Sequence, residues 1–422
     1  MCAPVAPEKC IFTRYKQGSR KYRKMSFPLH SGIFSVLETP QSIFHFNLNN
    51  EIIRTRSKGK DWSHPHEWLK RTAGNDWVYY STGGYTGVVE ATGEYYLPNF
   101  RYPSNSLLGG NPFSHSQVNK LVESWYCQLE KISKTDSMHT ADERDFLEQI
   151  LANNPNRLQQ KADTLFEIIG GRISVLPPDG RHVDYNIIPL NISLGCLYKC
   201  GFCKVKNNIA FSEKSEKEIS AQLVSLKELY GADMKNQNSL FLGEHDALHC
   251  NPLLILFSIK EALKAFGFDN SFLAEKYVFL FGSVSSLLNA PDQLFNDLQH
   301  LPIKSFINIG MESADQATLD ELGKPLTEKL IKEAFRRVQE INDNYPNIEI
   351  TCNFIMDSNL PEEHYPKTMN LLREQQSRTN PKGTIYFSPL TFNQPSRARL
   401  FEFNRLKVLS RFPTYLYIIQ RL

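Results

Sequence analysis

The chain has 422 residues, of which 41% are hydrophobic and 22% are charged, and its formal net charge is +3. This composition is that of a folded protein with more than one domain, and it excludes an intrinsically disordered chain. The charge does not indicate a nucleic-acid partner, and we expect no membrane-spanning segment and no export signal. The eight cysteines do not form the pattern of a secreted disulfide scaffold, so we expect a reducing, cytoplasmic setting.

The N-terminal residues are predicted to form an α+β region with a substrate-specific role. Aromatic, turn-rich segments around Gly83-Gly84 predict short antiparallel strands joined by tight turns. From 117 to 169 the pattern becomes helical, with an interruption at 153–156. Residues 176–180, Leu-Pro-Pro-Asp-Gly, are typical of a linker. The predicted division is an N-terminal region at 1–180, a core at 186–395 and a C-terminal tail at 396–422.

From residue 186 onward, short β-rich runs alternate with longer helical patterns. Six strand-then-helix steps in succession favour a parallel α/β architecture, and continuously apolar strands fit a sheet that is buried on both faces. The pattern alone does not distinguish a barrel from a flat doubly wound sheet. The predicted strands are 187–194, 239–243, 277–281, 305–311, 348–355 and 384–388, and the predicted helices are 213–230, 252–266, 290–300, 318–322, 327–342 and 361–375.

Three cysteines stand close together directly after the first of these strands. Cys196, Cys200 and Cys203 have the spacing C-x3-C-x2-C. Three thiolates on one loop can hold three corners of a [4Fe–4S] cube and leave the fourth iron free to chelate a small molecule. Two alternatives stay open. One is a zinc site completed by His249 or Cys250, although zinc sites are usually built from paired C-x2-C units. The other is a chance cluster of buried thiols.

Two further motifs follow strands. The carboxyl ends of parallel strands are the positions where such barrels hold their active-site residues. Gly243-Glu244 ends the second strand, where glycine permits close backbone approach and a carboxylate can pair with an ammonium group. The run 310–313, Gly-Met-Glu-Ser, ends the fourth strand and offers the Glu312 carboxylate to a diol. Ser283 and Asn308 are weaker candidates of the same kind. For each motif, an ordinary turn with a capping or solvated acid is the structural alternative.

The cysteine spacing, with Phe202 before the third cysteine, resembles the signature of the radical S-adenosylmethionine (SAM) superfamily. The strand-end motifs are similar to segments of its methylthiotransferase and elongator groups, and the resemblance covers residues 186–390. It implies a partial (β/α)6 barrel. It also implies an enzyme that uses a [4Fe–4S] cluster to cleave SAM reductively, giving a 5′-deoxyadenosyl radical that abstracts hydrogen from a substrate. The substrate is not identified by the sequence.

The resemblance further implies roles for single residues. Cys196, Cys200 and Cys203 would ligate the cluster, while Phe202 would lie near the adenine of SAM. Glu244, next to Gly243, would bind the amino group of SAM, and Glu312 would lie near its ribose. An electron donor such as flavodoxin or ferredoxin would supply the reducing electron. Leu242 stands where the family often has glycine. We therefore keep as an alternative an iron–sulfur electron-transfer protein that does not cleave SAM.

Overall fold

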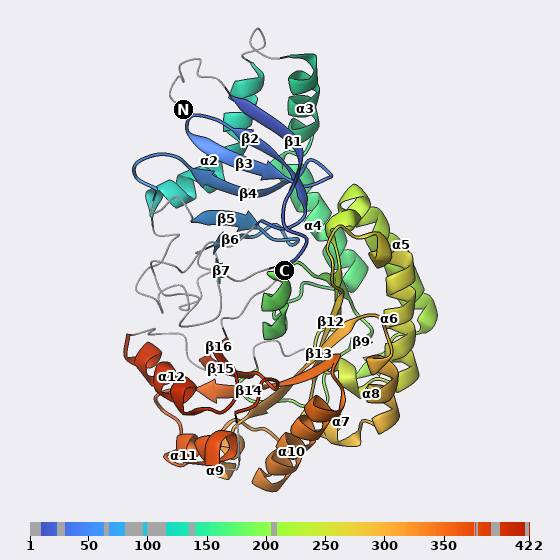
Figure 1. The fold of residues 1–422 in the computed structure, drawn as a ribbon, viewed down its shortest axis with the longest axis vertical. Helices are drawn as coiled ribbons and strands as arrows, with labels where there is room; N and C mark the ends of the chain where they lie inside the picture. The colour runs from blue at the N-terminus through green and yellow to red at the C-terminus, as the bar shows by residue number, and fades with distance from the viewer. Residues whose placement is uncertain are drawn as a thin grey trace.

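The computed structural model describes residues 10–22, 30–62, 67–80, 96–98, 115–134, 140–203, 209–374, 376, 379–389, 397–417 and 422. Two seven-stranded sheets organise the chain, one antiparallel and N-terminal, the other parallel. Figure 1 shows the first sheet in blue above the second, which is drawn mainly in yellow to red. Within the described residues, no helix combines the length and the apolar character that crossing a membrane requires.

The N-terminal sheet is a meander in which each strand pairs with the next one along the chain. Its strands are β1 (Ile11–Gln17), β2 (Ile33–Glu38), β3 (Ser42–Phe46), β4 (Ile52–Ser57), β5 (Trp68–Arg71), β6 (Trp77–Tyr80) and β7 (Tyr96–Pro98). Three helices follow, α2 (Ser116–Ser133), α3 (Ala141–Leu151) and α4 (Pro155–Ile169). The predicted antiparallel strands and the interrupted helical stretch are thereby confirmed, while Gly83-Gly84 lies outside the described residues.

One face of the N-terminal sheet is apolar and is covered by these helices. Phe44, Leu69 and Tyr79 are buried there in one cluster with Phe146 of α3. Because side chains alternate along a strand, the intervening residues belong to the opposite face. Lys70 is one of them, and its face turns toward the second sheet, since its ammonium group donates to a carbonyl oxygen at residue 184.

The second sheet is parallel throughout. In sheet order its strands are β8 (Ile188–Leu190), β11 (Ser239–Leu242), β12 (Tyr277–Gly282), β13 (Lys304–Glu312), β14 (Ile348–Met356), β15 (Ile385–Pro389) and β16 (Thr414–Leu416). The helices after β8 include α5 (Glu216–Tyr230), α6 (Pro252–Phe266), α7 (Val284–Asn289), α8 (Asp292–Gln299), α9 (Gln316–Glu321), α10 (Glu328–Asn344), α11 (His364–Met369) and α12 (Arg397–Leu409).

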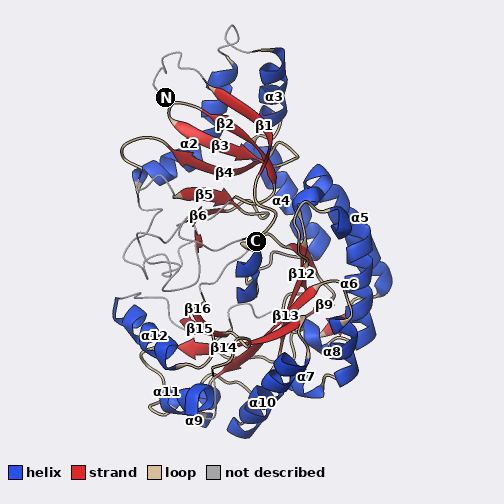
Figure 2. Cartoon of the chain, in the orientation of Figure 1, coloured by secondary structure: helices blue, strands red, loops and turns tan. Residues whose placement is uncertain are grey.

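The strand order decides between the two architectures that the sequence leaves open. A doubly wound sheet reverses its strand order at a switch point and carries helices on both faces. Here the described strands follow the order of the chain from one edge to the other, and right-handed crossovers then place the helices on one face. Figure 2 shows α5, α6, α8 and α10 on the outer side of a curved sheet. The fold is a partial α/β barrel joined to an antiparallel N-terminal sheet.

The barrel has one strand more than the six that the sequence predicts. β16 pairs with β15 in parallel, with Tyr415 opposite Tyr386, and α12 provides the crossover between them. The segment 396–422, predicted to be a tail, is therefore partly built into the sheet. The prediction missed β16 because a strand of three residues is too short to reveal a hydrophobic period.

Residues 176–180, predicted to be a linker, belong to a buried element instead. Pro178–Val183 form a 3₁₀ helix in which Asp179 is fully buried. The Asp179 carboxylate accepts hydrogen bonds from Thr351 of β14 and Tyr386 of β15, each at 2.7 Å. Proline and glycine do mark a tight turn here, but the strands that bury the turn lie far along the chain. Packing thus continues across the predicted domain boundary, and the division into domains stays a prediction.

Candidate functional site

A cavity of about 410 Å³ lies at the carboxyl ends of the parallel strands. Its wall contains residues that follow β11 and β12, residues of β13 and β14, and the end of β15. The cysteine loop after β9 (Ser193–Leu194) completes it. Among the predicted site residues, Gly243 is not part of the wall. The structure brings the others together in this cavity: Cys196, Cys200, Phe202, Cys203, Glu244, Ser283, Asn308 and Glu312.

The cysteine loop is held in place at three points. Gly195 opens it with a φ of 72°, and a Cβ atom there would lie 2.5 Å from the carbonyl oxygen of Ile209, so only glycine fits. The Tyr198 hydroxyl contacts the Ser285 hydroxyl and accepts a hydrogen bond from the Ser285 backbone N–H at 3.2 Å. The Gly201 N–H donates to a carbonyl oxygen at the end of α9 at 2.8 Å. The loop is therefore fixed to α7 and α9.

The three thiols form a donor set that fits a [4Fe–4S] cluster. The pKa values of Cys196 and Cys200 are raised, and burial is the main cause. The nearby Lys324 ammonium opposes this effect in both thiols. Among the described residues, no three His, Cys, Asp or Glu side chains are gathered around a single metal position. A cube does not require that arrangement, because each of its cysteine sulfurs binds a different iron. Ligation of a cluster by these cysteines remains a prediction. It is supported by the chemistry of the three thiols and by their position in the wall of one cavity.

The residues that a zinc site would need as a fourth ligand lie elsewhere. Neither His249 nor Cys250 lines the cavity. Cys250 is 2% exposed, and burial raises the pKa of its thiol to about 12. His249 stacks edge-on against Phe211. Both side chains therefore behave as structural groups, and the cavity wall offers the loop thiols alone among the described cysteines.

The Glu244 carboxylate faces the cavity, and the described residues leave its charge largely uncompensated. Its recorded ion partner among them is His245, with 4.0 Å between His245 Nε2 and Glu244 Oε2. Burial raises the pKa of Glu244 and lowers the pKa of His245. Gly243, with a φ of 76°, makes the turn that exposes Glu244, and a Cβ atom there would lie 3.1 Å from the Ala247 side chain. Glu244 is thus placed to accept an ammonium group from a ligand.

Glu312 occupies an unusual backbone position that a buried lysine stabilises. Its φ is 65°, and the register of β13 against β14 shifts between Gly310 and Glu312. The Lys324 ammonium donates to Glu312 Oε1 at 2.8 Å and to the Gly310 carbonyl oxygen at 2.6 Å. Lys324 also lines the cavity. Lys324 was not predicted for the site, because an isolated lysine after a short helix carries no signal of its partner.

Polar residues that hydrogen-bond to one another also line the cavity. The Asn308 amide donates to Asn353 Oδ1 at 3.2 Å and receives a hydrogen bond in return at 2.7 Å. Ser283 caps α7 through Ser286, and its backbone N–H donates to Asp246 at 3.0 Å. Asn353 and Asp246 also line the cavity and were not predicted for the site. Asp246 follows the end of β11, and that position is the one signal that could have found it, whereas Asn353 lies within β14.

No family model and no curated protein matches the chain. Among solved structures, it is similar to SuiB from Streptococcus suis at 11% identity and a TM-score of 0.35, covering 84% of this chain and 72% of SuiB. The cobalamin-dependent SAM radical enzyme OxsB, with aqua-cobalamin and SAM bound, matches at 16% identity and a TM-score of 0.35, over 54% of this chain and 30% of OxsB. A radical SAM methyltransferase from Sphaerobacter thermophilus matches at 14% identity and a TM-score of 0.34, over 54% of this chain and 64% of that one.

The OxsB and methyltransferase structures are those of radical SAM enzymes. The cysteine spacing of the present chain resembles the signature of this class. The chain spans less than a third of the length of OxsB.

Proposed function

We infer that the protein is a radical SAM enzyme that binds a [4Fe–4S] cluster and cleaves SAM to methionine and a 5′-deoxyadenosyl radical, which abstracts hydrogen from a substrate. The observation that carries this proposal is the shared cavity. Three loop thiols line it together with carboxylates from two strand ends, at the edge where parallel barrels hold their active sites. When bound, the cluster would supply the electron that breaks a carbon–sulfur bond of SAM.

The residues of the chain would bind and orient the reactants. Cys196, Cys200 and Cys203 would ligate three irons. Glu244 would accept hydrogen bonds from the amino group of SAM, a charge-assisted interaction for which its carboxylate is placed. Glu312, held by Lys324, would accept from the ribose hydroxyls through the carboxylate oxygen that Lys324 does not engage.

The setting of the reaction would be reducing. The cysteines of the described residues are free thiols, which suits a cytoplasmic compartment. A flavodoxin or ferredoxin is the proposed electron donor.

Metal analysis after anaerobic reconstitution tests the first part of the proposal. Wild-type protein should bind about four irons per chain, and Cys196→Ala, Cys200→Ala and Cys203→Ala should each lose most of them. Cys352→Ala is the matched control, because Cys352 is fully buried in β14 and does not line the cavity. Preferential binding of zinc in place of iron would overturn the proposal and favour a structural metal site.

SAM binding separates the enzyme from an iron–sulfur electron carrier. SAM should perturb the electron paramagnetic resonance spectrum of the reduced cluster in wild-type protein. Glu244→Gln, which keeps the shape but removes the charge, should weaken SAM binding by about tenfold, the loss expected for one charge-assisted hydrogen bond. An unchanged spectrum with a fully loaded cluster would favour the electron carrier.

A further inference from the structure

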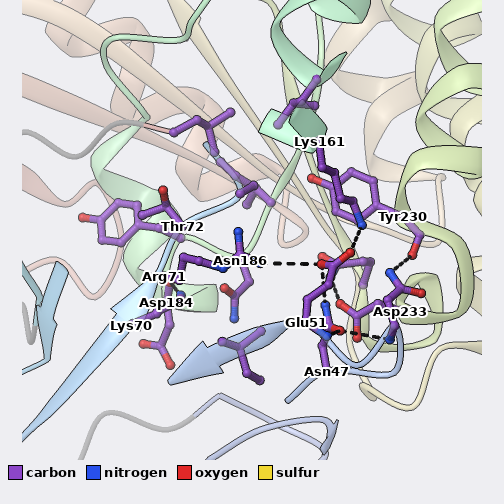
Figure 3. Close-up of a pocket in the computed structure, with 18 of the residues that line it drawn as sticks. Asn47, Glu51, Lys70, Arg71, Thr72, Lys161, Asp184, Asn186, Tyr230 and Asp233 are labelled. Atoms are coloured by element: carbon purple, nitrogen blue, oxygen red, sulfur yellow. Dashed lines mark hydrogen bonds and ion pairs between the residues drawn. The ribbon is translucent and has the colours of Figure 1, made fainter. Parts of the chain in front are cut away.

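A second cavity, between the N-terminal sheet and the barrel, contains a carboxylate that the protein itself compensates. This cavity measures about 130 Å³. Figure 3 shows Glu51 between Lys161 and Arg71, with both of which it is paired. Glu51 also accepts a hydrogen bond from the Asn47 amide at 3.1 Å. The cavity of the cysteine loop differs, because the carboxylate of Glu312 is held there on a strained backbone.

Glu312 is the central residue of a very tight turn at the end of β13. Its φ is 65°, and the Ser313 N–H donates across it to the Met311 carbonyl oxygen at 2.9 Å. A hydrogen bond between residues two apart, with a positive φ between them, defines the γ-turn that is rare and strained. Strained backbone of this kind persists only where the surrounding contacts hold it. The turn at Glu312 therefore depends on its neighbours.

The side chain of Glu312 folds back over Gly310 toward Lys324. A Cβ atom at position 310 would lie 2.6 Å from Glu312 Oε1, so the glycine leaves the room that the carboxylate occupies. The Lys324 ammonium donates to this same oxygen at 2.8 Å. Lys324 therefore holds the side chain of Glu312, and a different contact holds the turn.

That contact is made by His364, the first residue of α11. His364 is fully buried, and its Nδ1 atom lies 2.8 Å from the Ser313 hydroxyl oxygen. Its Nε2 atom lies 3.1 Å from the Ile355 carbonyl oxygen. Burial lowers the pKa of His364 to about 4, so the ring is neutral at neutral pH. The hydroxyl oxygen of Ser313 also accepts from the Asp315 N–H at 3.0 Å.

The hydrogen bonds of His364 have one consistent direction. A carbonyl oxygen can only accept, so Nε2 of the neutral ring carries the proton and donates to Ile355. Nδ1 is then an acceptor, and the Ser313 hydroxyl donates to it. His364 thereby ties Ser313, directly after the turn, to Ile355 of β14, which lines the cavity. A buried network whose members are all satisfied makes the structure around it rigid.

We propose that His364 is a positioning residue for Glu312. Through Ser313 it keeps the strained turn closed, so that the Glu312 carboxylate stays beside Lys324 and can accept a hydrogen bond from a ligand hydroxyl. His364 does not line the cavity, so it acts on the ligand only through Glu312. The hydroxyls would be those of the ribose of SAM, and this part of the inference rests on the proposed function.

Two substitutions of nearly equal shape separate the hydrogen bond from the packing of the side chain. In His364→Asn the amide oxygen can still accept from Ser313, whereas His364→Leu offers no acceptor. Ser313→Ala removes the same hydrogen bond with a smaller change in volume, and it decides the test if His364→Leu does not fold. Thr368→Val is the control, because Thr368 is fully buried one turn further along α11 and its hydroxyl has no recorded partner.

The coupling between Lys324 and Glu312 tests the turn in the absence of cluster and SAM. It is obtained from urea unfolding with and without Lys324→Met and Glu312→Gln. In His364→Leu and Ser313→Ala the coupling should fall below half of its wild-type value, because the released turn no longer directs the carboxylate to the lysine. His364→Asn and Thr368→Val should keep it. Full coupling in His364→Leu and Ser313→Ala, or no coupling in wild type, would overturn the proposal.

Binding to cluster-loaded protein tests the consequence for the ligand. The probes are SAM and an analogue of SAM that lacks the 2′ and 3′ hydroxyls of the ribose. His364→Leu should weaken the Kd of SAM by about tenfold, the loss of one hydrogen bond to a charged group, and should leave the Kd of the analogue unchanged. Equal losses for both probes would overturn the action through Glu312. If wild type binds neither probe while His364→Leu loses the coupling, the proposed function fails and the role of His364 in the turn stands.

Discussion

Replacing Lys324 by methionine removes the cation that faces Glu312 at the cavity of the cysteine loop. The two side chains are 5% and 12% exposed and lie 2.8 Å apart. Removing one partner of a buried ion pair costs about 3–5 kcal/mol, because the other charge stays buried without compensation. Glu312 borders a cavity that water can reach, so the lower end of that range applies. We expect Lys324→Met to lower the free energy of unfolding by about 3 kcal/mol.

A double-mutant cycle with Glu312→Gln isolates the pair from other effects of the lysine. The double variant leaves no uncompensated charge, so its loss should be smaller than the sum of the two single losses by about 2 kcal/mol, and that difference is the coupling energy. Urea unfolding of the four proteins measures it. A coupling energy below about 0.5 kcal/mol, as is common for exposed ion pairs, would refute the inference that Lys324 holds Glu312 in position.

Gly195→Ala places a Cβ atom 2.5 Å from a backbone oxygen, so reconstituted protein should bind markedly less iron, and wild-type iron content would contradict a loop fixed at that residue. Tyr198→Phe removes the hydroxyl shared with Ser285 and should lower the free energy of unfolding by about 1 kcal/mol; urea unfolding without a shift would show that this contact is dispensable. Burial raises the pKa of Asp179 from 3.8 to about 6. Its contribution to stability is therefore present below pH 4 and is lost as the pH rises through 6. Relative to Asp179→Asn, wild type should lose roughly 2 kcal/mol between pH 4 and pH 6.5, and parallel stability profiles of the two proteins would contradict this.

The parallel barrel could be predicted because its local signals agree with its tertiary structure. The helix predicted at 252–266 begins at Pro252 and is followed by Gly267 in a left-handed conformation, as proline at the first turn and glycine at the end favour. The strands are continuous apolar runs, as expected for a sheet buried on both faces. Glu244 and Glu312 reach one cavity because the carboxyl ends of parallel strands meet at one edge.

What the sequence did not reveal are partnerships between segments distant along the chain. Lys324 is defined as a site residue by its contacts with Glu312 and Gly310, and neither is its neighbour in sequence. The burial of Asp179 depends on Thr351 and Tyr386 in the same way.

Formation of 5′-deoxyadenosine tests the central claim most directly. Reduced, cluster-loaded protein would be incubated with SAM under anaerobic conditions, and the nucleosides would be separated by liquid chromatography. The proposed function predicts 5′-deoxyadenosine from wild type and from Cys352→Ala, and none above background from Cys200→Ala. Absence of 5′-deoxyadenosine from fully loaded wild-type protein, or equal amounts from Cys200→Ala, would contradict it.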